Sequence, residues 1–421
     1  MRVALLSYRS KPHCGGQGIY VRHLSRELVA LGHDVEVFSG QPYPELDEGV
    51  TLTRVPSLDL YREPDPFRIP RPREFRDLTD GQEFLIMCTG GFPEPRTFSK
   101  RVIRMLRQRK DEFDVVLDNQ VLGHGLLEVE ELGLPMVTAI HHPITFDRRI
   151  DLAAAPSLRK KLGLRRWYGF LRMQGKVARE ARKVVTVSES SYRDIVTDFG
   201  VDPSRMRVIP LGADDEFVPP TEPRVPGRIL AMASADAPMK GIATLLEAFA
   251  KLRTERDLEL VLVTRPKPGG RTETMVDQLG IADSVRFVHG VSQSELVALM
   301  GSAELACVPS LYEGFSLPTV ELMACGTPLV VSRAGAIPEV VGPDGVAAEL
   351  VEPGNVEQLR VAIGSLLDDP ERRARMGRAA RRRVEETFSW KAVARQTAEA
   401  FAEAIEERKA ERCSAGKACG C

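Results

Sequence analysis

The chain has 421 residues, of which 43% are hydrophobic and 28% charged, and its formal net charge is -1. A single hydrophobic core rarely grows beyond about 250 to 300 residues, so at least two domains are expected. This composition excludes a disordered or fibrous protein, and the near-zero charge argues against a general nucleic-acid binder.

The N-terminal region has a strand–helix–strand pattern. Residues 2–8 are a short apolar run typical of a buried strand, and a glycine-rich turn follows at residues 11–18. Apolar residues at helical spacing then continue to Gly32, and residues 34–40 form a second predicted strand. The first run is too short for a signal-peptide core or a membrane span, so we expect a cytoplasmic protein.

Further units of the same kind follow. Strands are predicted at residues 113–119, 134–143 and 183–190, with a helix at 125–133. Residues 41–77 are rich in proline and arginine, and the prolines exclude a central strand. This segment predicts a long loop that shapes an acceptor pocket.

A second α/β series begins after the breaker-rich residues 213–226. Helices, such as one at residues 243–255, alternate there with apolar strands at residues 228–234, 258–264, 285–290, 303–310, 327–332 and 347–353. The chain ends in two segments of helical pattern, residues 371–389 and 390–412. Two consecutive α/β domains are therefore expected.

The seven cysteines do not have the layout of a secreted disulfide framework. Cys413, Cys419 and Cys421 form a C-terminal cluster that suits a soft metal or redox chemistry. Their spacing matches no zinc pattern, so we favour a frayed terminus.

The glycine-rich turn is a candidate phosphate site. Gly16 and Gly18 would let backbone N–H groups approach a phosphate at the positive end of a helix dipole. A dinucleotide-binding fingerprint would need a third glycine where Val21 stands and an acid after the second strand, and both are missing. A turn required only for tight packing is the alternative.

The segment "PSLYEGFSLPTVELMACGTPLVVS", residues 309–332, carries two carboxylates. Glu313 follows a predicted strand, and Glu321 lies within a helix that should start near Ser316, where the hydroxyl can cap and Pro318 fits the first turn. Ligands of open parallel sheets bind beyond the carboxyl ends of the strands, which is where this loop lies.

A nucleotide sugar has matching needs, with hydroxyls at both ends and a diphosphate between them. Carboxylates accept hydrogen bonds from vicinal hydroxyls, and N–H groups at a helix N-terminus suit phosphates. The amides expected to serve this purpose are those of Gly314, Phe315, Ser316 and Leu317.

Residues 309–341 resemble the C-terminal signature of glycosyltransferase family 4, also described as glycosyl transferases group 1. The resemblance extends through "GGQGIYVRHLSRELVALGHDVEVFSG", "TVSESS", "KGIATLLEAF" and "FSWKAVARQ", and so covers nearly the whole chain. It implies a GT-B fold, with two Rossmann-like domains facing a central cleft. The implied domains are an acceptor-side domain, 1–213 with a returning helix 389–410, and a donor-binding domain, 214–388.

The resemblance also implies residue roles. Glu313 contacts the donor sugar, Glu321 the donor ribose, and the amides of residues 314–317 hold the sugar and phosphates. Lys240 neutralises the diphosphate, and His141 contacts the reacting sugar. Gly16 and Gly18 face the phosphate and the acceptor.

One position departs from the family pattern. Many members carry an arginine shortly before the lysine, whereas Ala235 stands there in this chain. Arg265, which follows the next predicted strand, is the nearest candidate by topology to replace the missing arginine. The alternative is that Arg265 is an exposed loop residue without this role.

The implied reaction moves a sugar from a UDP- or GDP-linked donor to a hydroxyl acceptor with retention of configuration. Glu313, Lys240 and His141 are the expected catalytic residues, and Glu313 is not assigned as a nucleophile. No D-x-D pair occurs in the sequence, so neither a metal nor another cofactor is expected.

Residues 157–183 are strongly basic, with interleaved apolar side chains. Such a segment suits an anionic membrane surface, and many family members use lipid-linked acceptors at the cytoplasmic face. The protein is then expected to be peripheral at the inner membrane face. A solvated helix face is the alternative.

Two other functions remain open. A nucleotide-sugar epimerase would share the fold but would convert the donor without an acceptor. The second alternative is a non-catalytic sugar- or lipid-binding protein. The only feature that supports it is Ala235, which stands where many family members have an arginine. The donor base, the sugar and the acceptor, whether lipid-linked, a glycan or a small molecule, are not fixed by the sequence.

Overall fold

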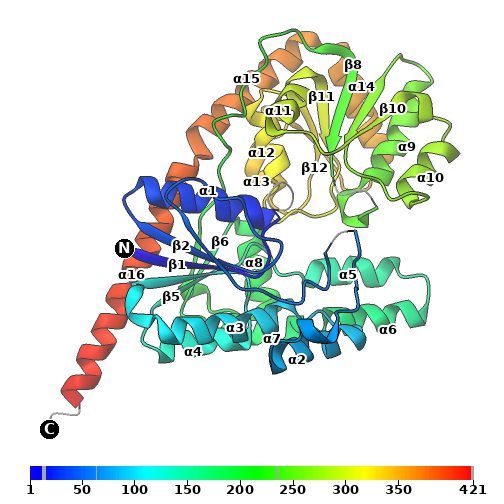
Figure 1. Cartoon of the computed structure of the whole chain (residues 1–421). Coiled ribbons are helices and arrows are strands. Elements are labelled where there is room, and N and C mark those ends of the chain that lie inside the picture. The colour runs from blue at the N-terminus through cyan, green and yellow to red at the C-terminus, as the bar shows by residue number, and fades with distance from the viewer. Residues whose placement is uncertain (12–15, 63, 234–235, 419–421) are drawn as a thin grey trace. The chain divides into compact units, whose positions relative to one another are not determined.

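The computed structural model describes residues 1–11, 16–62, 64–233 and 236–418 (Figure 1). The chain divides into two compact units. Unit 1 contains Met1–Val187, Ser191–Ile209 and Trp390–Cys421, and unit 2 contains Ser188–Ser190 and Pro210–Ser389. Each unit is a parallel sheet with helices on its faces, which confirms the expected α/β class.

Unit 1 has a seven-stranded sheet in the order β3-β2-β1-β4-β5-β6-β7. Its strands are β1 (Arg2–Ser7), β2 (Asp34–Ser39), β3 (Thr51–Arg54), β4 (Val115–Asn119), β5 (Met136–Ala139), β6 (Lys183–Thr186) and β7 (Met206–Val208). Its helices are α1 (Gly16–Ala30), α2 (Leu78–Cys88), α3 (Glu94–Gln108), α4 (Leu127–Glu131), α5 (Thr145–Ala154), α6 (Leu158–Trp167), α7 (Leu171–Glu180), α8 (Glu189–Phe199) and α16 (Trp390–Ala418).

The proline-rich segment 41–77 is not a continuous loop. It contains β3, which pairs with β2 alone and forms an edge of the sheet. This position agrees with the exclusion of a central strand, because only an edge strand tolerates neighbouring prolines without losing ladder hydrogen bonds.

Unit 2 has a six-stranded sheet in the order β10-β9-β8-β11-β12-β13. Its strands are β8 (Val225–Met232), β9 (Glu259–Val263), β10 (Val285–Val288), β11 (Ala303–Val308), β12 (Leu329–Ser332) and β13 (Glu349–Val351). Its helices are α9 (Ile242–Arg253), α10 (Arg271–Gln278), α11 (Gln293–Ser302), α12 (Leu317–Ala324), α13 (Ile337–Val341), α14 (Val356–Asp368) and α15 (Pro370–Thr387).

Both sheets reverse their strand order at one point, as the Rossmann order does. The first strand of each unit, β1 or β8, lies between strands that extend the sheet in opposite directions. The loops at the carboxyl ends of the strands on either side of the reversal diverge and leave room for a ligand. The switch points are therefore β1/β4 in unit 1 and β8/β11 in unit 2.

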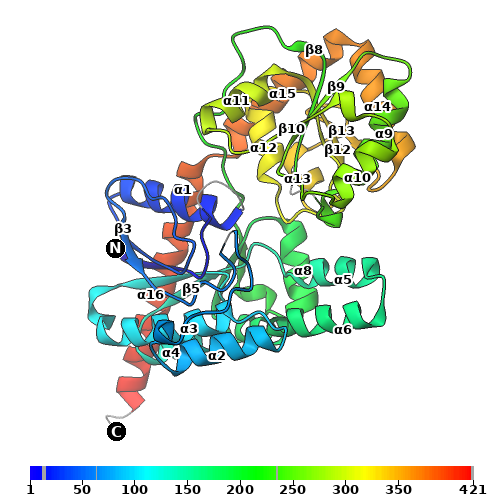
Figure 2. The ribbon, with the colours of Figure 1, turned by 45° about the vertical axis from the view of Figure 1, so that its right-hand side comes forward.

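The last helix, α16, belongs to unit 1 and packs on α1 and β5. Figure 2 shows it running along that unit. The Trp390 ring stacks on His23 at 5.1 Å between centroids and meets Tyr20 edge-on at 6.2 Å. Within the part of the chain that the structure describes, no helix is both long and apolar enough to cross a bilayer.

Candidate functional site

Lys240 and Glu313 meet at the switch point of unit 2. Lys240 follows β8 and Glu313 follows β11, the neighbouring strand. Lys240 Nζ lies 2.7 Å from Glu313 Oε1, and Ser310 Oγ donates to the same oxygen at 2.7 Å. The structure thus brings together two predicted site residues that are 73 positions apart.

Glu321 is a buried carboxyl group in α12. Its side chain has no hydrogen-bond or ion-pair partner among the described residues, although the residue is only 8% exposed. Burial, together with the nearby negative charge of Asp214, raises the pKa of Glu321 to about 7. A buried polar group without a partner costs stability, and perturbed groups of this kind cluster at functional sites.

The start of α12 corrects one prediction. Ser316 is the N-cap residue, but its hydroxyl does not bond a backbone N–H, and its Oγ lies 2.8 Å from Thr319 Oγ1 instead. Ser316 also has a φ of 82°, which serine rarely adopts. The expected side-chain cap was therefore wrong.

The N-terminus of α12 has backbone N–H groups that no side chain caps. Within the described part of the chain, the N–H groups of Phe315, Ser316 and Leu317 have no hydrogen-bond partner. Gly314 contributes its carbonyl, which accepts from Ser188 Oγ at 2.7 Å. Unsatisfied donors at a helix N-terminus favour an anion.

Two glycines that the sequence reasoning did not single out hold the Glu313 loop. A Cβ on Gly241 would lie 1.9 Å from the Pro309 carbonyl oxygen, and a Cβ on Gly335 would lie 2.1 Å from that of Glu313. Both have positive φ, and the Ala336 N–H donates to the Glu313 carbonyl at 2.9 Å. Their signal in the sequence is a glycine directly after Lys240 and another shortly after a strand end.

Arg265 is exposed and lies two residues after β9, which is the neighbour of β8. It makes no hydrogen bond or ion pair with any residue that the structure describes. Ala235 lies outside the described residues, as do Cys419 and Cys421. The role of Arg265 as a replacement cation therefore stays a prediction.

His141 lies just beyond β5 in unit 1. Its Nε2 is 2.7 Å from Asn119 Oδ1, and its backbone N–H donates to Gln120 Oε1 at 2.8 Å. The ring meets Tyr20 edge-on at 4.7 Å. Burial, with a smaller effect of His142, lowers the pKa of His141 to about 3, so the imidazole is neutral at pH 7. With Asn119 accepting from Nε2, the other ring nitrogen is left as an acceptor.

The two glycines of the first turn differ in their surroundings. A Cβ on Gly18 would lie 2.0 Å from the Lys11 carbonyl oxygen, so packing alone accounts for that glycine. A Cβ on Gly16 would meet nothing within 4 Å. Residues 12–15 of the predicted turn lie outside the described residues.

A partly buried ion pair near the β1/β4 switch point was not predicted from the sequence. Arg9 follows β1, and its Nη2 lies 3.0 Å from Glu94 Oε1 at the start of α3. Glu94 Oε2 and Arg9 Nε are buried without a partner, and burial raises the pKa of Glu94 to about 8. The Arg9 guanidinium also lies over the Tyr61 ring, at 5.8 Å from its centroid.

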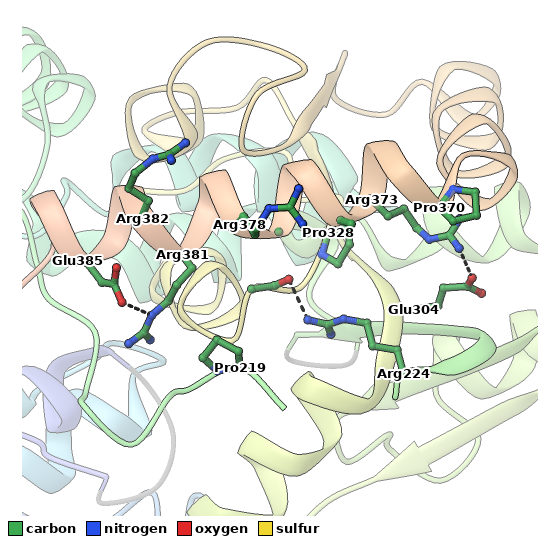
Figure 3. A pocket seen from close by; sticks show the side chains of 13 residues that line it. Pro219, Arg224, Glu304, Pro328, Pro370, Arg373, Arg378, Arg381, Arg382 and Glu385 are labelled. Atoms are coloured by element: carbon green, nitrogen blue, oxygen red, sulfur yellow. Dashed lines mark hydrogen bonds and ion pairs between the residues drawn. The ribbon is translucent and has the colours of Figure 1, made fainter. Parts of the chain in front are cut away.

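A hollow of about 460 Å³ in unit 2 lies elsewhere, beside α15 (Figure 3). None of the predicted site residues lines it. Arg224 and Arg381 extend along this hollow, but both donate to backbone carbonyl oxygens, such as that of Gly326 at 2.8 Å from Arg224 Nη2. We therefore interpret these arginines as structural.

Two Rossmann-like units, each with its own switch point, form the architecture of the GT-B glycosyltransferases. The family models agree. "Glycosyltransferase Family 4" matches residues 14–217, and "Glycosyl transferases group 1" matches residues 214–383. The chain belongs to this glycosyltransferase family, which confirms the resemblance seen in the sequence.

One curated relative is the "MMP alpha-(1->4)-mannosyltransferase" of Mycolicibacterium hassiacum. It is 59% identical over 406 residues, which are 96% of this chain and 98% of the relative. An alignment this long and complete also shows the family.

Two solved structures share the fold. Sucrose-phosphate synthase from Thermosynechococcus elongatus has a TM-score of 0.75 at 22% identity, covering 96% of this chain and 99% of its own. Anabaena HepE in complex with UDP-glucose has a TM-score of 0.67 at 17% identity, and the match covers 96% of this chain and 100% of HepE.

Proposed function

We propose that this glycosyltransferase is a retaining mannosyltransferase. It transfers mannose from a nucleotide-diphosphate donor to the 4-hydroxyl of a sugar acceptor. The observation that carries the proposal is the contact between Lys240 and Glu313 at the β8/β11 switch point, next to the open N-terminus of α12. The sugar and the linkage are supported by the name of the relative that is 59% identical. Retention then requires an α-linked donor, because the product linkage is α.

The donor is held by unit 2 in this proposal. Lys240 and the amides at the start of α12 stabilise the charge that develops on the leaving diphosphate. Glu313 accepts hydrogen bonds from the mannose hydroxyls, and Glu321 accepts from the ribose. The neutral ring of His141 contributes its second nitrogen, Nδ1, as an acceptor for a hydroxyl of the reacting sugar.

We propose that the acceptor hydroxyl attacks the anomeric carbon from the same face as the leaving diphosphate, which retains the configuration. The leaving phosphate takes the proton of the acceptor hydroxyl, and the acceptor oxygen forms its bond to the anomeric carbon as the carbon–oxygen bond to phosphate breaks. Glu313 Oε1 is held by both Lys240 and Ser310, which makes it a poor nucleophile.

We further propose that no metal or other cofactor is needed, because Lys240 supplies the positive charge at the diphosphate and the sequence lacks a D-x-D pair. Transfer should continue at an unchanged rate in the presence of a chelator. Loss of transfer that added Mg²⁺ or Mn²⁺ restores would contradict this.

A donor screen tests the main proposal. The protein is titrated calorimetrically with GDP-mannose, UDP-mannose and the corresponding glucose esters, and products of transfer to a mannose acceptor are identified by NMR. We expect one mannose donor to bind most tightly and an α-(1→4) linkage in the product. Conversion of the donor to an epimer without any acceptor would overturn the proposal.

Membrane contact is a second, independent proposal. Leu158 and Leu162 on α6 are 80% and 63% exposed, and the exposed Arg165 lies on the same helix face. The double change Leu162→Ser and Arg165→Ser should weaken binding to vesicles that contain anionic lipid, measured by co-sedimentation. Equal sedimentation of the variant and the unchanged protein would end this proposal.

A further inference from the structure

A second hollow, of about 600 Å³, lies in unit 1 beside α6. Phe67, Leu164 and Trp167 supply apolar surface, and Asp151 and Lys160 supply polar groups. Asp151 Oδ2 accepts a hydrogen bond from the Tyr168 hydroxyl at 2.7 Å, which leaves its other oxygen for a ligand. Both the volume and the mixture of apolar surface with a few polar groups are typical of small-molecule sites.

The backbone at Phe67 is strained. Its φ is 66°, a conformation that bulky side chains seldom adopt, and the residue is 59% exposed. The Phe67 N–H donates to the Leu60 carbonyl at 2.7 Å, which fixes the turn. The strain holds a largely exposed ring beside Trp167, at 6.2 Å between centroids, and strained residues cluster at ligand sites.

Aromatic contacts connect the side chains that line the hollow with Arg9, which follows β1. The Tyr61 ring meets Phe67 at 5.4 Å and Trp167 at 5.7 Å between centroids, both edge-on. The Arg9 guanidinium, just after β1, also lies over the Tyr61 ring. Arg9 in turn pairs with the buried Glu94. The rings of Tyr61, Phe67 and Trp167 therefore form one aromatic wall, which contacts Arg9 at Tyr61.

We propose that this hollow binds sugar residues of an oligosaccharide acceptor. These are residues of the acceptor other than the one that receives the mannose. This inference rests on the proposed function. Aromatic rings pack well against the C–H faces of sugar rings, and a carboxylate with a lysine suits sugar hydroxyls. The face of α6 that carries Leu158 and Leu162 is opposite the one that carries Leu164 and Trp167, so the hollow does not depend on a membrane.

The chain has two tryptophans, which makes the site observable. Trp390 is 3% exposed, whereas Trp167 lines the hollow. Titration with α-(1→4)-linked mannose oligosaccharides, without any donor, should give a saturable change in tryptophan emission. Trp167→Phe should remove this signal while calorimetry still detects binding.

Phe67→Ala is the decisive variant. It should raise the Kd for the oligosaccharide at least tenfold, and Leu162→Ala, on the opposite face of α6, should leave the Kd unchanged. In transfer assays Phe67→Ala should raise KM for the oligosaccharide acceptor and leave KM for the donor unchanged. Transfer to methyl α-mannoside, which cannot reach the hollow, should be unaffected.

The oligosaccharide titration contains no donor. Its result therefore tests binding to the hollow even if the protein does not transfer mannose. Absence of oligosaccharide binding, or an unchanged Kd in Phe67→Ala, would overturn the inference even if mannose transfer is confirmed. Anionic phosphatidylserine vesicles are the comparison. If they change the emission of Trp167 and the oligosaccharides do not, a lipid surface occupies the site and the inference is also overturned.

Discussion

At the scale of single residues, Glu321 combines burial with the absence of a partner. Its pKa is raised from the ordinary value of 4.5 to about 7, so between these values the folded protein holds a proton that the unfolded chain has released. Stability therefore falls as pH rises through this window and levels off above it.

Glu321→Gln removes this titration. We compare the two proteins without donor. The unfolding free energy of the variant minus that of the unchanged protein should increase from pH 5 to pH 8, by an amount on the order of 2 kcal/mol. Urea denaturation at several pH values measures the difference. A constant difference over this range would contradict a raised pKa, because the other buried acids titrate equally in both proteins.

Lys240 should act mainly on the chemical step. Lys240→Met should lower kcat for mannose transfer by roughly 10² to 10³, as removal of one group that stabilises developing charge does. Steady-state kinetics with the best donor of the screen provide the measurement. Lys251→Met, an exposed lysine of α9 that pairs with Glu357, is the control and should leave kcat unchanged.

The sequence could propose donor-site residues but not their contacts. Glu313 was proposed from its local motif and Lys240 from the family resemblance, and their ion pair follows from the adjacency of β8 and β11. The partly buried Arg9–Glu94 pair lies in no motif, since it joins residues 85 positions apart. The conformation of Ser316 was missed because a serine before a helix is usually a cap.

At the scale of elements, the loop between β11 and α12 depends on close backbone contacts. Gly335→Ala would place a Cβ 2.1 Å from the Glu313 carbonyl oxygen and should displace the loop that carries Glu313. Donor affinity should fall at least tenfold in calorimetry. Gly345→Ala is a matched control, because it also has positive φ, 76° against 54°, but its Cβ would meet nothing within 4 Å.

Both variants should lose about 1 to 2 kcal/mol of stability from the left-handed conformation alone. Only Gly335→Ala should also lose donor binding. Equal donor affinity in the two variants would show that this contact does not position Glu313.

The elements that the sequence predicted best are the buried strands. Residues 2–7 and 303–308 are apolar runs bounded by turn residues, and both form central strands. The edge strand β3 was missed because its partly exposed residues do not show the apolar run of a central strand. Helices α2 and α3 were not predicted, although α3 buries one face.

At the scale of the whole molecule, each unit has its own core and its own switch point. The proposed donor residues Lys240, Glu313 and Glu321 belong to unit 2, and His141 with the aromatic wall belongs to unit 1. A nucleoside diphosphate alone should therefore protect backbone amides of the β8–α9 and β11–α12 loops from hydrogen exchange. The family resemblance in the sequence already implied separate acceptor-side and donor-binding domains.

The chain returns to unit 1 through α16, so the stability of that unit depends on its last residues. Trp390 is 3% exposed and contacts His23 and Tyr20 of α1. Trp390→Ala should destabilise unit 1 by about 3 to 5 kcal/mol, because it removes a buried aromatic side chain and leaves a cavity.

Hydrogen exchange resolved by segment measures this effect. Amides of α1 and β5 should exchange faster in Trp390→Ala, while those of β8 and β11 keep their rates because they belong to the other unit. Lys391→Ala changes the exposed neighbour of Trp390 and should alter neither set. Faster exchange in both units would mean that the chain unfolds as one cooperative body, so the separate cores would not be separately stable.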